Sequence, residues 1–434
     1  MSILEQLSAN HAKSQYYRGD ERPASPPASS VRLIAYYLPQ FHPIPENDTW
    51  WGKGFTEWTN VSKALPRFKG HYQPHLPGEL GFYDLRLADT LRSQAKLARG
   101  YGLTGLCFHH YWFGGKQILE TPIQLLLRNP DIDIRFCINW ANENWTRRWD
   151  GSDREILIGQ AHSAADDLAF AASLEPLFRD PRYIRVNGRP LMMVYRPKVL
   201  LNPRATVRRW RTHFQAAGLG DPYIVMAQSH GETDPRPYGM DAAAGFPPHN
   251  HGFRGTNLRD AVERLDSAYC GTVFDYAEMA AAARAYLPSE FPFFPGVCPG
   301  WDNEARHPGV GICFKGANPD AYGEWLAAAC QAALASPDPE ERIVFVNAWN
   351  EWAEGAHLEP DRHFGYAYLV ETARVVSDLS GCSNQGQSRP MPSRSASPHG
   401  KLREISKSAV KHVAFRGAKL AEWTAVILRR IARL

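Results

Sequence analysis

The feature of this sequence that most constrains its fold is an alternation of short apolar runs with helix-like segments, which begins at Arg32. The runs are rich in β-branched and aromatic residues, and such an alternation is typical of parallel strands joined by helices. The pattern predicts strands at residues 32–38, 103–108, 134–140, 190–195, 223–228, 241–246, 293–299 and 342–348. It predicts helices at residues 84–99, 164–178, 205–217, 319–335 and 364–378.

Eight strands that alternate mostly with helices predict an α/β fold, namely a (β/α)8 TIM-type barrel. The competing architecture is a doubly wound sheet, in which a glycine-rich phosphate-binding turn normally follows the first strand. The sequence after the first predicted strand, PQFHPIPEND, contains no glycine. We therefore favour the barrel, although Pro and Gly blur the pattern at the sixth and seventh strands.

The composition divides the chain into four segments. Residues 1–30 are polar and end in a Pro/Ser/Ala stretch, which predicts a flexible N-terminal lead. Residues 31–380 hold the barrel pattern and form the expected catalytic domain, and residues 381–400 are a Ser/Pro/Gly/Gln-rich stretch that predicts a disordered linker. Residues 401–434 predict a basic amphipathic helix with nine Lys or Arg and two Glu. Such a helix can make peripheral contact with an anionic membrane, dock on a partner or pack on its own barrel.

The composition excludes several classes of protein. The 49 basic and 45 acidic residues nearly balance, whereas a nucleic-acid-binding protein would concentrate basic charge on one face. The seven cysteines are odd in number and form no CxxC pair, so neither a disulfide framework nor a zinc ribbon is expected. No apolar run approaches the roughly 20 residues of a membrane span, and the N-terminus lacks a signal-peptide core. We expect a cytoplasmic protein.

Trp, Tyr, His, Asn, Glu and Arg recur directly after the predicted strands. In a barrel enzyme the reacting groups come from these carboxyl ends. The mixture suits sugars, because aromatic faces cover C–H surfaces and polar groups match fixed hydroxyls. We therefore expect a polysaccharide or oligosaccharide substrate. The expected substrate-binding residues are His42, Trp51, Glu57, Trp58, His110, Tyr111, Trp112, Asn139, Trp140, Asn142, Glu143, Asn144, Trp145, Arg147, Tyr195, Trp301, Asp302, Trp349, Asn350 and Trp352.

Reaction at a glycosidic bond needs two carboxyl groups. The best pair is Glu351 and Glu354 in WNEWAEG, because both follow the last strand and their apolar flanks tend to raise a carboxyl pKa. The alternative is that one of them caps a helix or pairs with an arginine. Glu143 is a weaker candidate, since Arg147 and Arg148 lie close in sequence.

The histidines do not predict a metal site. His109 and His110 are adjacent on a strand and therefore point to opposite faces, so one of them is expected in the core. No HExxH or comparable ligand spacing occurs, and Asp131-Ile132-Asp133 precedes a strand at the non-catalytic end of the barrel. We expect neither a metal nor another cofactor.

Five long motifs resemble the WbsX-type family of glycosyltransferases from bacterial surface-polysaccharide clusters. This family is similar to glycoside hydrolase family ninety-nine, whose members are (β/α)8 endo-α-mannosidases and endo-mannanases with a WNEWxEG signature. The resemblance spans about residues 32–375. The motifs are YYLPQFHPIPENDTWWGKGFTEWTNV (36–61), HYQPHLPGELGFYDLR (71–86), HYWFGGK (110–116), WANENWTRRWDG (140–151) and WNEWAEG (349–355).

The resemblance implies roles for the glutamate pair. Glu351 would act as a base on the sugar 2-hydroxyl, giving an anhydro-sugar, and Glu354 would act as general acid and then as base. The hydrolases typically have His between the Trp and the second Glu, where this chain has Ala353. This departure puts mannose specificity in question.

Three functions are consistent with these observations. The first is retaining glycosidase chemistry in the production of a bacterial surface polysaccharide, O-antigen or lipopolysaccharide. The second is a WbsX-type glycosyltransferase that adds a sugar to a lipid-linked glycan, although no Gly-rich loop or metal clamp for a diphosphate is found. The third is a non-catalytic glycan-binding scaffold.

Overall fold

The computed structural model describes residues 1–382, except residues 28, 148–151, 251–252, 254 and 289. In this part of the chain the main sheet is a path of parallel strands in the order β12-β10-β9-β8-β4-β2-β1-β15-β13. The strands are β1 (Arg32–Tyr37), β2 (Gly105–Phe113), β4 (Arg135–Trp140), β8 (Arg189–Val194), β9 (Tyr223–Gln228), β10 (Ala242–Gly245), β12 (Phe293–Phe294), β13 (Gly296–Val297) and β15 (Ile343–Val346).

The seventh strand position closes the barrel. β12 pairs with β10 on one side, and β13 pairs with β15 on the other. Only Pro295 separates these two short strands, and its carbonyl accepts a hydrogen bond from Phe345 N at 3.0 Å. Proline has no N–H to donate, so the strand is divided at this residue. The nine strands therefore occupy eight positions, and the predicted (β/α)8 barrel is confirmed.

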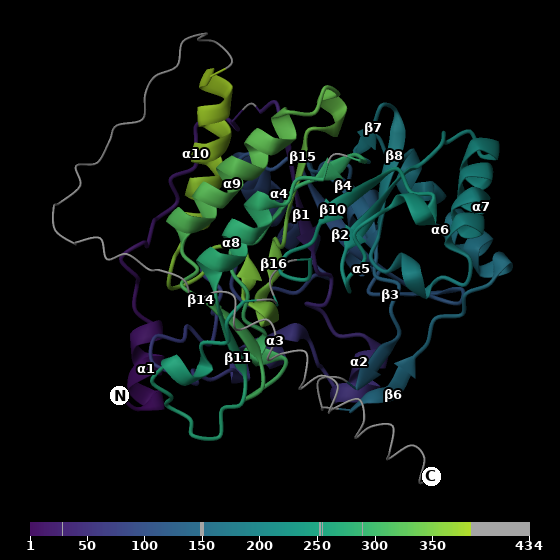
Figure 1. Ribbon diagram of the computed structural model, residues 1–434. Helices are drawn as coiled ribbons and strands as arrows, with labels where there is room; N and C mark the ends of the chain where they lie inside the picture. The colour runs from purple at the N-terminus through teal and green to yellow at the C-terminus, as the bar shows by residue number, and fades with distance from the viewer. Residues whose placement is uncertain (28, 148–151, 251–252, 254, 289, 383–434) are drawn as a thin grey trace, which may run out of the picture. The chain divides into compact units, whose positions relative to one another are not determined.

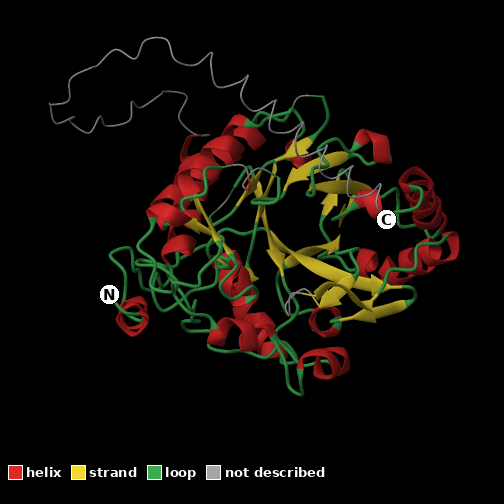
Figure 2. Cartoon of the chain, turned by 60° about the horizontal axis from the view of Figure 1, so that its bottom comes forward, coloured by secondary structure: helices red, strands yellow, loops and turns green. Residues whose placement is uncertain are grey.

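Helices surround the barrel, as Figures 1 and 2 show. Most of them begin at a side chain that accepts a hydrogen bond from the first turn, namely Ser163, Asn202, Asp275 and Asn318. All five predicted helices are present, and α5 and α8 are additional. The helices are α4 (Ala88–Gly100), α5 (Thr121–Arg128), α6 (Ala164–Arg179), α7 (Pro203–Ala216), α8 (Tyr276–Ala285), α9 (Pro319–Leu334) and α10 (Ala367–Cys382).

The segments that follow the barrel strands carry further elements, whereas the segments that precede them are short. These elements build the end of the barrel at which a site is expected. They are α2 (Pro45–Trp51), α3 (Glu57–Lys63), β3 (Lys116–Ile118), β5 (Trp145–Arg147), β6 (Ser152–Ile158), η2 (Pro197–Val199), η3 (Arg236–Tyr238), η5 (Arg259–Ala261), β11 (Thr272–Asp275), η6 (Asn303–Ala305), β14 (Ile312–Lys315), β16 (Asn350–Glu351), η8 (Trp352–Glu354) and β17 (Ala356–His357). At the opposite end lie β7 (Arg185–Val186) and η7 (Pro339–Glu341).

The N-terminal segment differs from the expected flexible lead. Residues Ile3–Asn10 form α1, which begins at a capping box between Ser2 and Glu5. The buried amide of Asn10 donates hydrogen bonds of 2.8 Å to the carbonyls of His71 and Gln73. These bonds tie α1 to the loop after α3, which a polar composition alone does not reveal.

The predicted linker and basic helix fall almost entirely outside the described residues, which end at Cys382. None of the helices in the described part of the chain combines the length with the apolar character that a membrane span requires.

Candidate active site

A cleft of about 710 Å³ lies at the carboxyl end of the barrel. Each of the eight strand positions contributes to its wall, which is how a barrel of this kind assembles a site from distant parts of the chain. In chain order the contributions include Gln40, His109, Tyr111, Asn142, Glu143, Asn144, Trp145, Tyr195, Arg196, His230, Phe246, His249, Trp301, Asn303, Arg306, Asn347, Glu351 and Glu354.

Ten of the 22 site residues expected from the sequence line this cleft together. They combine aromatic rings, amides and carboxylates, which is the set of groups that a glycan site needs. They are Trp51, Tyr111, Asn142, Glu143, Asn144, Trp145, Tyr195, Trp301, Glu351 and Glu354.

Arg306 joins the two expected catalytic glutamates. Its Nη2 lies 2.9 Å from Glu351 Oε2, and its Nη1 lies 2.5 Å from Glu354 Oε1. Its Nε donates to Glu57 Oε2 at 2.9 Å, so three carboxylates share one guanidinium. The side chain of Glu57 is fully buried, whereas that of Glu354 is 18% exposed. The cluster therefore runs from the protein interior to the cleft surface.

The loop that carries the pair is fixed to the end of β1. The amide of Asn350 accepts from Leu38 N at 2.7 Å and donates to Leu38 O at 3.0 Å. Trp349 N donates to Tyr36 O at 2.8 Å, and Gly355 ends the turn with a φ of 60° that favours glycine. These contacts hold Glu351 and Glu354 at the mouth of the barrel.

Burial dominates the electrostatics of the cluster. It raises the pKa of Glu351 to about 8, because Arg306 only partly offsets the loss of water and the neighbouring Glu354 and Glu57 add to the effect. Burial opposes the charge of Arg306, yet Glu57, Glu354 and Glu351 together hold its pKa well above the ordinary value. The cluster thus combines a fixed cation with a carboxyl that titrates near neutral pH.

His109 faces this cluster and His110 does not. His109 Nε2 lies 3.7 Å from Glu351 Oε1, and the Asn139 amide nitrogen lies 3.2 Å from its Nδ1. Burial lowers the pKa of His109 to about 4, and Arg306 adds to the shift. The ring of His110 packs on Phe170 of α6, on the outer face of β2. The histidine that faces the site is therefore His109 and not His110, which the sequence analysis had selected.

Two tryptophans expected in the site also point outward. Trp112 Nε1 donates to Asp166 Oδ1 of α6 at 2.9 Å, and Trp140 stacks on Phe170 and packs on Trp210. Both rings lie between the barrel and its helices. Their large apolar surfaces stabilise that interface instead of meeting a substrate.

The remaining expected residues lie below or beside the cleft. Those below it support the loops that line it: Glu57, Trp58, Asn139, Trp349, Asn350 and Trp352 are all buried. His42 is buried as well, and Asp302 pairs with His71 at 2.6 Å. For Arg147 the structure describes the strand β5 but not the side chain.

Glu143 has a partner that its sequence neighbourhood did not suggest. Its Oε1 lies 2.6 Å from Arg196 Nη1 and 3.6 Å from His230 Nε2. Arg148 and the side chain of Arg147 lie outside the described residues, so the expected local pairing stays a prediction, and the contact that the structure shows joins two strand ends. The carboxylate and the arginine together form a polar wall of the cleft.

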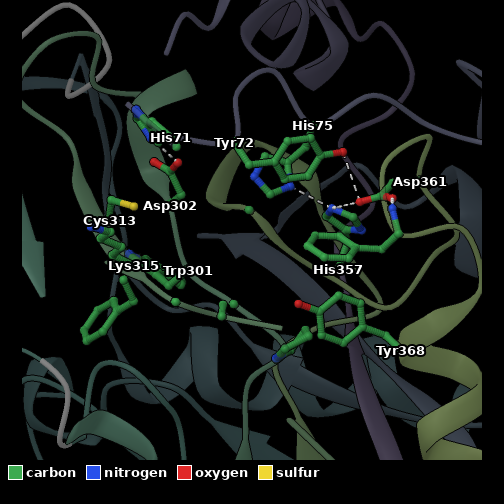
Figure 3. Close-up of a pocket in the computed structure, with 18 of the residues that line it drawn as sticks. His71, Tyr72, His75, Trp301, Asp302, Cys313, Lys315, His357, Asp361 and Tyr368 are labelled. Atoms are coloured by element: carbon green, nitrogen blue, oxygen red, sulfur yellow. Dashed lines mark hydrogen bonds and ion pairs between the residues drawn. The ribbon is translucent and has the colours of Figure 1, made fainter. Parts of the chain in front are cut away.

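Among the residues that the structure describes, two groups of side chains could hold a metal ion, and both lie outside this cleft. They are His71, Asp302 and Cys313, and His75, His357 and Asp361. All six residues line a second pocket of about 100 Å³, which shares Trp301 with the cleft (Figure 3).

Comparison with known proteins gives a family and a set of relatives. Residues 33–372 match the family model described as glycosyltransferase WbsX. Two proteins called "Uncharacterized protein WxcX", from strains B100 and ATCC 33913 of Xanthomonas campestris pv. campestris, are 48% identical to this chain over 361 residues. The alignment covers 83% of this chain and 51% of each relative, so the chain spans about half the length of the curated relatives it matches.

Among solved structures, a family 99 endo-α-mannosidase from Bacteroides thetaiotaomicron is similar in fold, with a TM-score of 0.49 and 17% identity over 82% of this chain and 99% of that chain. A "Glycoside hydrolase-like protein" has the same TM-score of 0.49 and 14% identity, over 83% of this chain and 98% of that chain.

Proposed function

The chain belongs to the glycosyltransferase WbsX family, and from this premise we propose that it acts on the glycosidic bonds of a bacterial surface polysaccharide, with Glu351 and Glu354 as its reacting carboxyl groups. The polysaccharide class that the resemblance implies is the O-antigen of lipopolysaccharide or a similar glycan. The proposal includes a cytoplasmic location, with residues 401–434 in contact with the inner membrane and a lipid-linked substrate.

The observation that carries the proposal is the Arg306 cluster at the floor of the cleft. Two carboxylates on one short loop are held by one guanidinium, and aromatic and amide side chains line the walls around them. A retaining reaction requires one ionised and one protonated carboxyl at the same bond. The pKa of Glu351 lies near neutral, which supports a state in which one carboxyl of the pair holds a proton and the other is ionised.

The proposed chemistry proceeds in two steps. In the first step the Glu351 carboxylate takes the proton of the sugar 2-hydroxyl, and that oxygen attacks the anomeric carbon. The bond from the anomeric carbon to the leaving oxygen breaks, and Glu354 gives that oxygen its proton. In the second step the Glu354 carboxylate takes a proton from an incoming hydroxyl, which opens the anhydro-sugar while Glu351 returns its proton to the 2-oxygen.

The raised pKa of Glu351 suits the first of these roles. A carboxylate with a high pKa is a stronger base, and a catalytic pKa near the working pH balances basicity against the ionised fraction. Glu354 is the more exposed of the two, so it is better placed to meet the leaving group and the incoming hydroxyl. Arg306 would stabilise whichever of the two is ionised.

Transfer is a second candidate function, and the family description favours it. The same pair would perform transfer if the incoming hydroxyl belonged to a lipid-linked glycan instead of water. A non-catalytic scaffold that only binds glycan is the alternative from another class.

Mass spectrometry of lipid-linked glycans distinguishes these functions. We would compare cells that carry the wild-type chain, a deletion, Glu354→Gln, or Glu175→Gln as a matched control. Glu175 is also paired with an arginine, Arg179 at 3.0 Å, but it lies on the outer helix α6. A glycan one sugar short in the deletion and Glu354→Gln cells indicates transfer, and longer or untrimmed glycans indicate hydrolysis. If the glycan pool changes in the deletion cells but not in the Glu354→Gln cells, the chain acts only as a glycan-binding scaffold. If the pool is unchanged in both, the proposed substrate is refuted.

A further inference from the structure

The second pocket contains three buried side chains whose donor atoms converge. His75 Nδ1 lies 3.0 Å from His357 Nε2, and His357 Nε2 lies 3.8 Å from Asp361 Oδ2. The ligand atoms of the three residues all lie within 4.8 Å of one another (Figure 3). His75 comes from the loop after α3, whereas His357 and Asp361 follow the glutamate pair. Two imidazoles and a carboxylate at such distances form an open three-ligand set for a transition-metal ion.

The surroundings orient these groups as ligands. His357 Nδ1 lies 3.0 Å from the carbonyl oxygen of Glu359, so Nδ1 carries the hydrogen and Nε2 presents its lone pair to the group. The His357 ring stacks on Trp352, with centroids 3.8 Å apart. The Tyr72 hydroxyl donates to Asp361 Oδ2 at 3.1 Å, and His363 N donates to Asp361 Oδ1 at 2.9 Å. Metal-binding histidines and carboxylates are commonly fixed by such outer hydrogen bonds.

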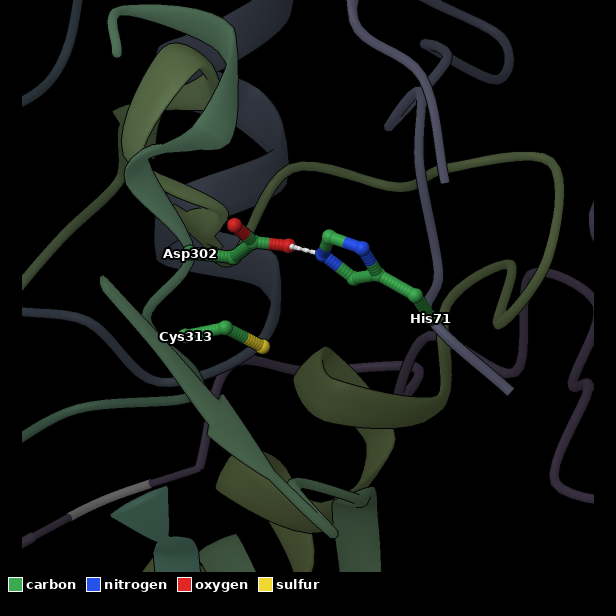
Figure 4. A group of neighbouring side chains, drawn as sticks. All are labelled: His71, Asp302 and Cys313. Atoms are coloured by element: carbon green, nitrogen blue, oxygen red, sulfur yellow. Dashed lines mark hydrogen bonds and ion pairs between the residues drawn. The ribbon is translucent and has the colours of Figure 1, made fainter. Parts of the chain in front are cut away.

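The other candidate group, His71, Asp302 and Cys313, is not oriented to bind a metal. Arg67 N donates to His71 Nδ1 at 3.0 Å, so the hydrogen of the neutral ring lies on Nε2 and is donated to Asp302 Oδ2 at 2.6 Å (Figure 4). The Arg67 amide keeps that hydrogen on Nε2, so Nε2 has no lone pair for a metal. His75 Nδ1 also carries a hydrogen, toward His357 Nε2, but a neutral imidazole can move that hydrogen to its other ring nitrogen when a metal replaces this bond. Burial raises the pKa of Cys313 well above its ordinary value, which keeps its thiol protonated. This group is a hydrogen-bonded pair beside a buried thiol.

We propose that His75, His357 and Asp361 bind a divalent zinc ion, with water in the fourth position. Two imidazoles and one carboxylate with a water in the open position form a ligand set that zinc accepts, and the same set also suits Fe²⁺. The ion would join the loop after α3 to the segment that holds Trp352 and the glutamate pair. Its role is structural, since it lies in a pocket separate from the carboxylates.

The test uses the full chain, loaded with Zn²⁺ and freed of excess metal by gel filtration. We expect about one zinc per chain, a higher Tm with zinc than with a chelator, and both effects lost in His75→Gln, with an affinity at least about tenfold weaker. The Gln amide can still donate to His357 Nε2, which preserves the metal-free hydrogen bond. Cys313→Ser is the matched control from the other group and should bind zinc like the wild type.

Cobalt gives a second measurement on the unmutated protein. Co²⁺ at this site should show visible tetrahedral bands without a thiolate charge-transfer band. No stoichiometric metal in the wild type, or binding that Cys313→Ser removes and His75→Gln retains, would overturn the proposal.

Discussion

The guanidinium of Arg306 lies 2.9 Å from the carboxylate of Glu351. The two residues come from the loops after β13 and β15, which are neighbouring strands at the point where the barrel closes. The side chain of Glu351 is only 7% exposed and that of Arg306 only 12%. A buried ion pair costs free energy when one partner is removed, because the remaining charge has neither a partner nor water. This relationship makes the floor of the cleft sensitive to both charge and pH.

Removal of the cation should destabilise the protein strongly. Arg306→Gln leaves the fully buried Glu57 beside Glu351 and Glu354 without a compensating charge. We expect the free energy of unfolding in urea to fall by about 3–5 kcal/mol. Arg179→Gln, which breaks the exposed pair with Glu175 on α6, should cost at most about 1 kcal/mol. Equal, small losses in both variants would contradict a structural role for Arg306.

The raised pKa of Glu351 should make the stability of the protein depend on pH. Its folded-state pKa of about 8 lies above the ordinary value of 4.5, so between these values the folded protein holds one more proton than the unfolded chain. The free energy of unfolding therefore falls as pH rises, by about 1 kcal/mol per pH unit from this group. Glu351→Gln should remove that part of the slope.

Urea unfolding at several pH values between 5 and 8 measures this slope. Burial also raises the pKa of Glu359 and of Asp361 to about 7, so both residues add slope of the same sign in wild type and variant. The difference between the two slopes isolates Glu351. Parallel curves would show that its pKa is not raised.

The tail at residues 401–434 gives a prediction about location. Its nine Lys or Arg would each contribute about 1 kcal/mol of attraction to an anionic membrane surface. Deletion of these residues should move the protein from the membrane fraction to the soluble fraction, and high salt should release the intact chain. If the tail packs on the barrel instead, deletion will lower the Tm and leave the partitioning unchanged.

The barrel could be predicted from the sequence because its strands are buried on both faces. In β9 all six residues are buried, so Tyr223–Gln228 stands out as a continuous apolar run and was predicted with its observed bounds. β2 continues to Phe113, five residues beyond its predicted end at Phe108. The prediction stopped early because the polar His109 and His110 interrupt the apolar pattern. Short apolar runs therefore locate the barrel strands better than they define their ends.

The individual residues of the site were harder to predict from the sequence than its position at the carboxyl end of the barrel. Glu351 and Glu354 stand in a motif directly after a strand, but Arg306 lies 45 residues before Glu351, within a loop that has no such pattern. The pairing of β13 with β15 brings the two loops together, and this pairing joins strands that are far apart in the sequence. The alternation along β2 places His109 and His110 on opposite faces, yet it cannot tell which face is the inner one when both are covered.

Tryptophans on the inner and outer faces of the barrel should respond to substitution in opposite ways, one through glycan affinity and the other through stability. Trp51 lines the cleft, so Trp51→Ala should weaken glycan binding roughly tenfold, the equivalent of about 1 kcal/mol of aromatic contact, with the free energy of unfolding nearly unchanged. Trp112 faces α6, so Trp112→Phe should leave glycan affinity unchanged. It should lower the free energy of unfolding by about 1–3 kcal/mol, because Asp166 loses a buried donor. Calorimetric titration with the purified cellular glycan, and urea unfolding of both variants, measure these effects. Weaker binding by a folded Trp112→Phe protein would mean that the substrate reaches the outer face of β2, which would refute the assignment of the cleft.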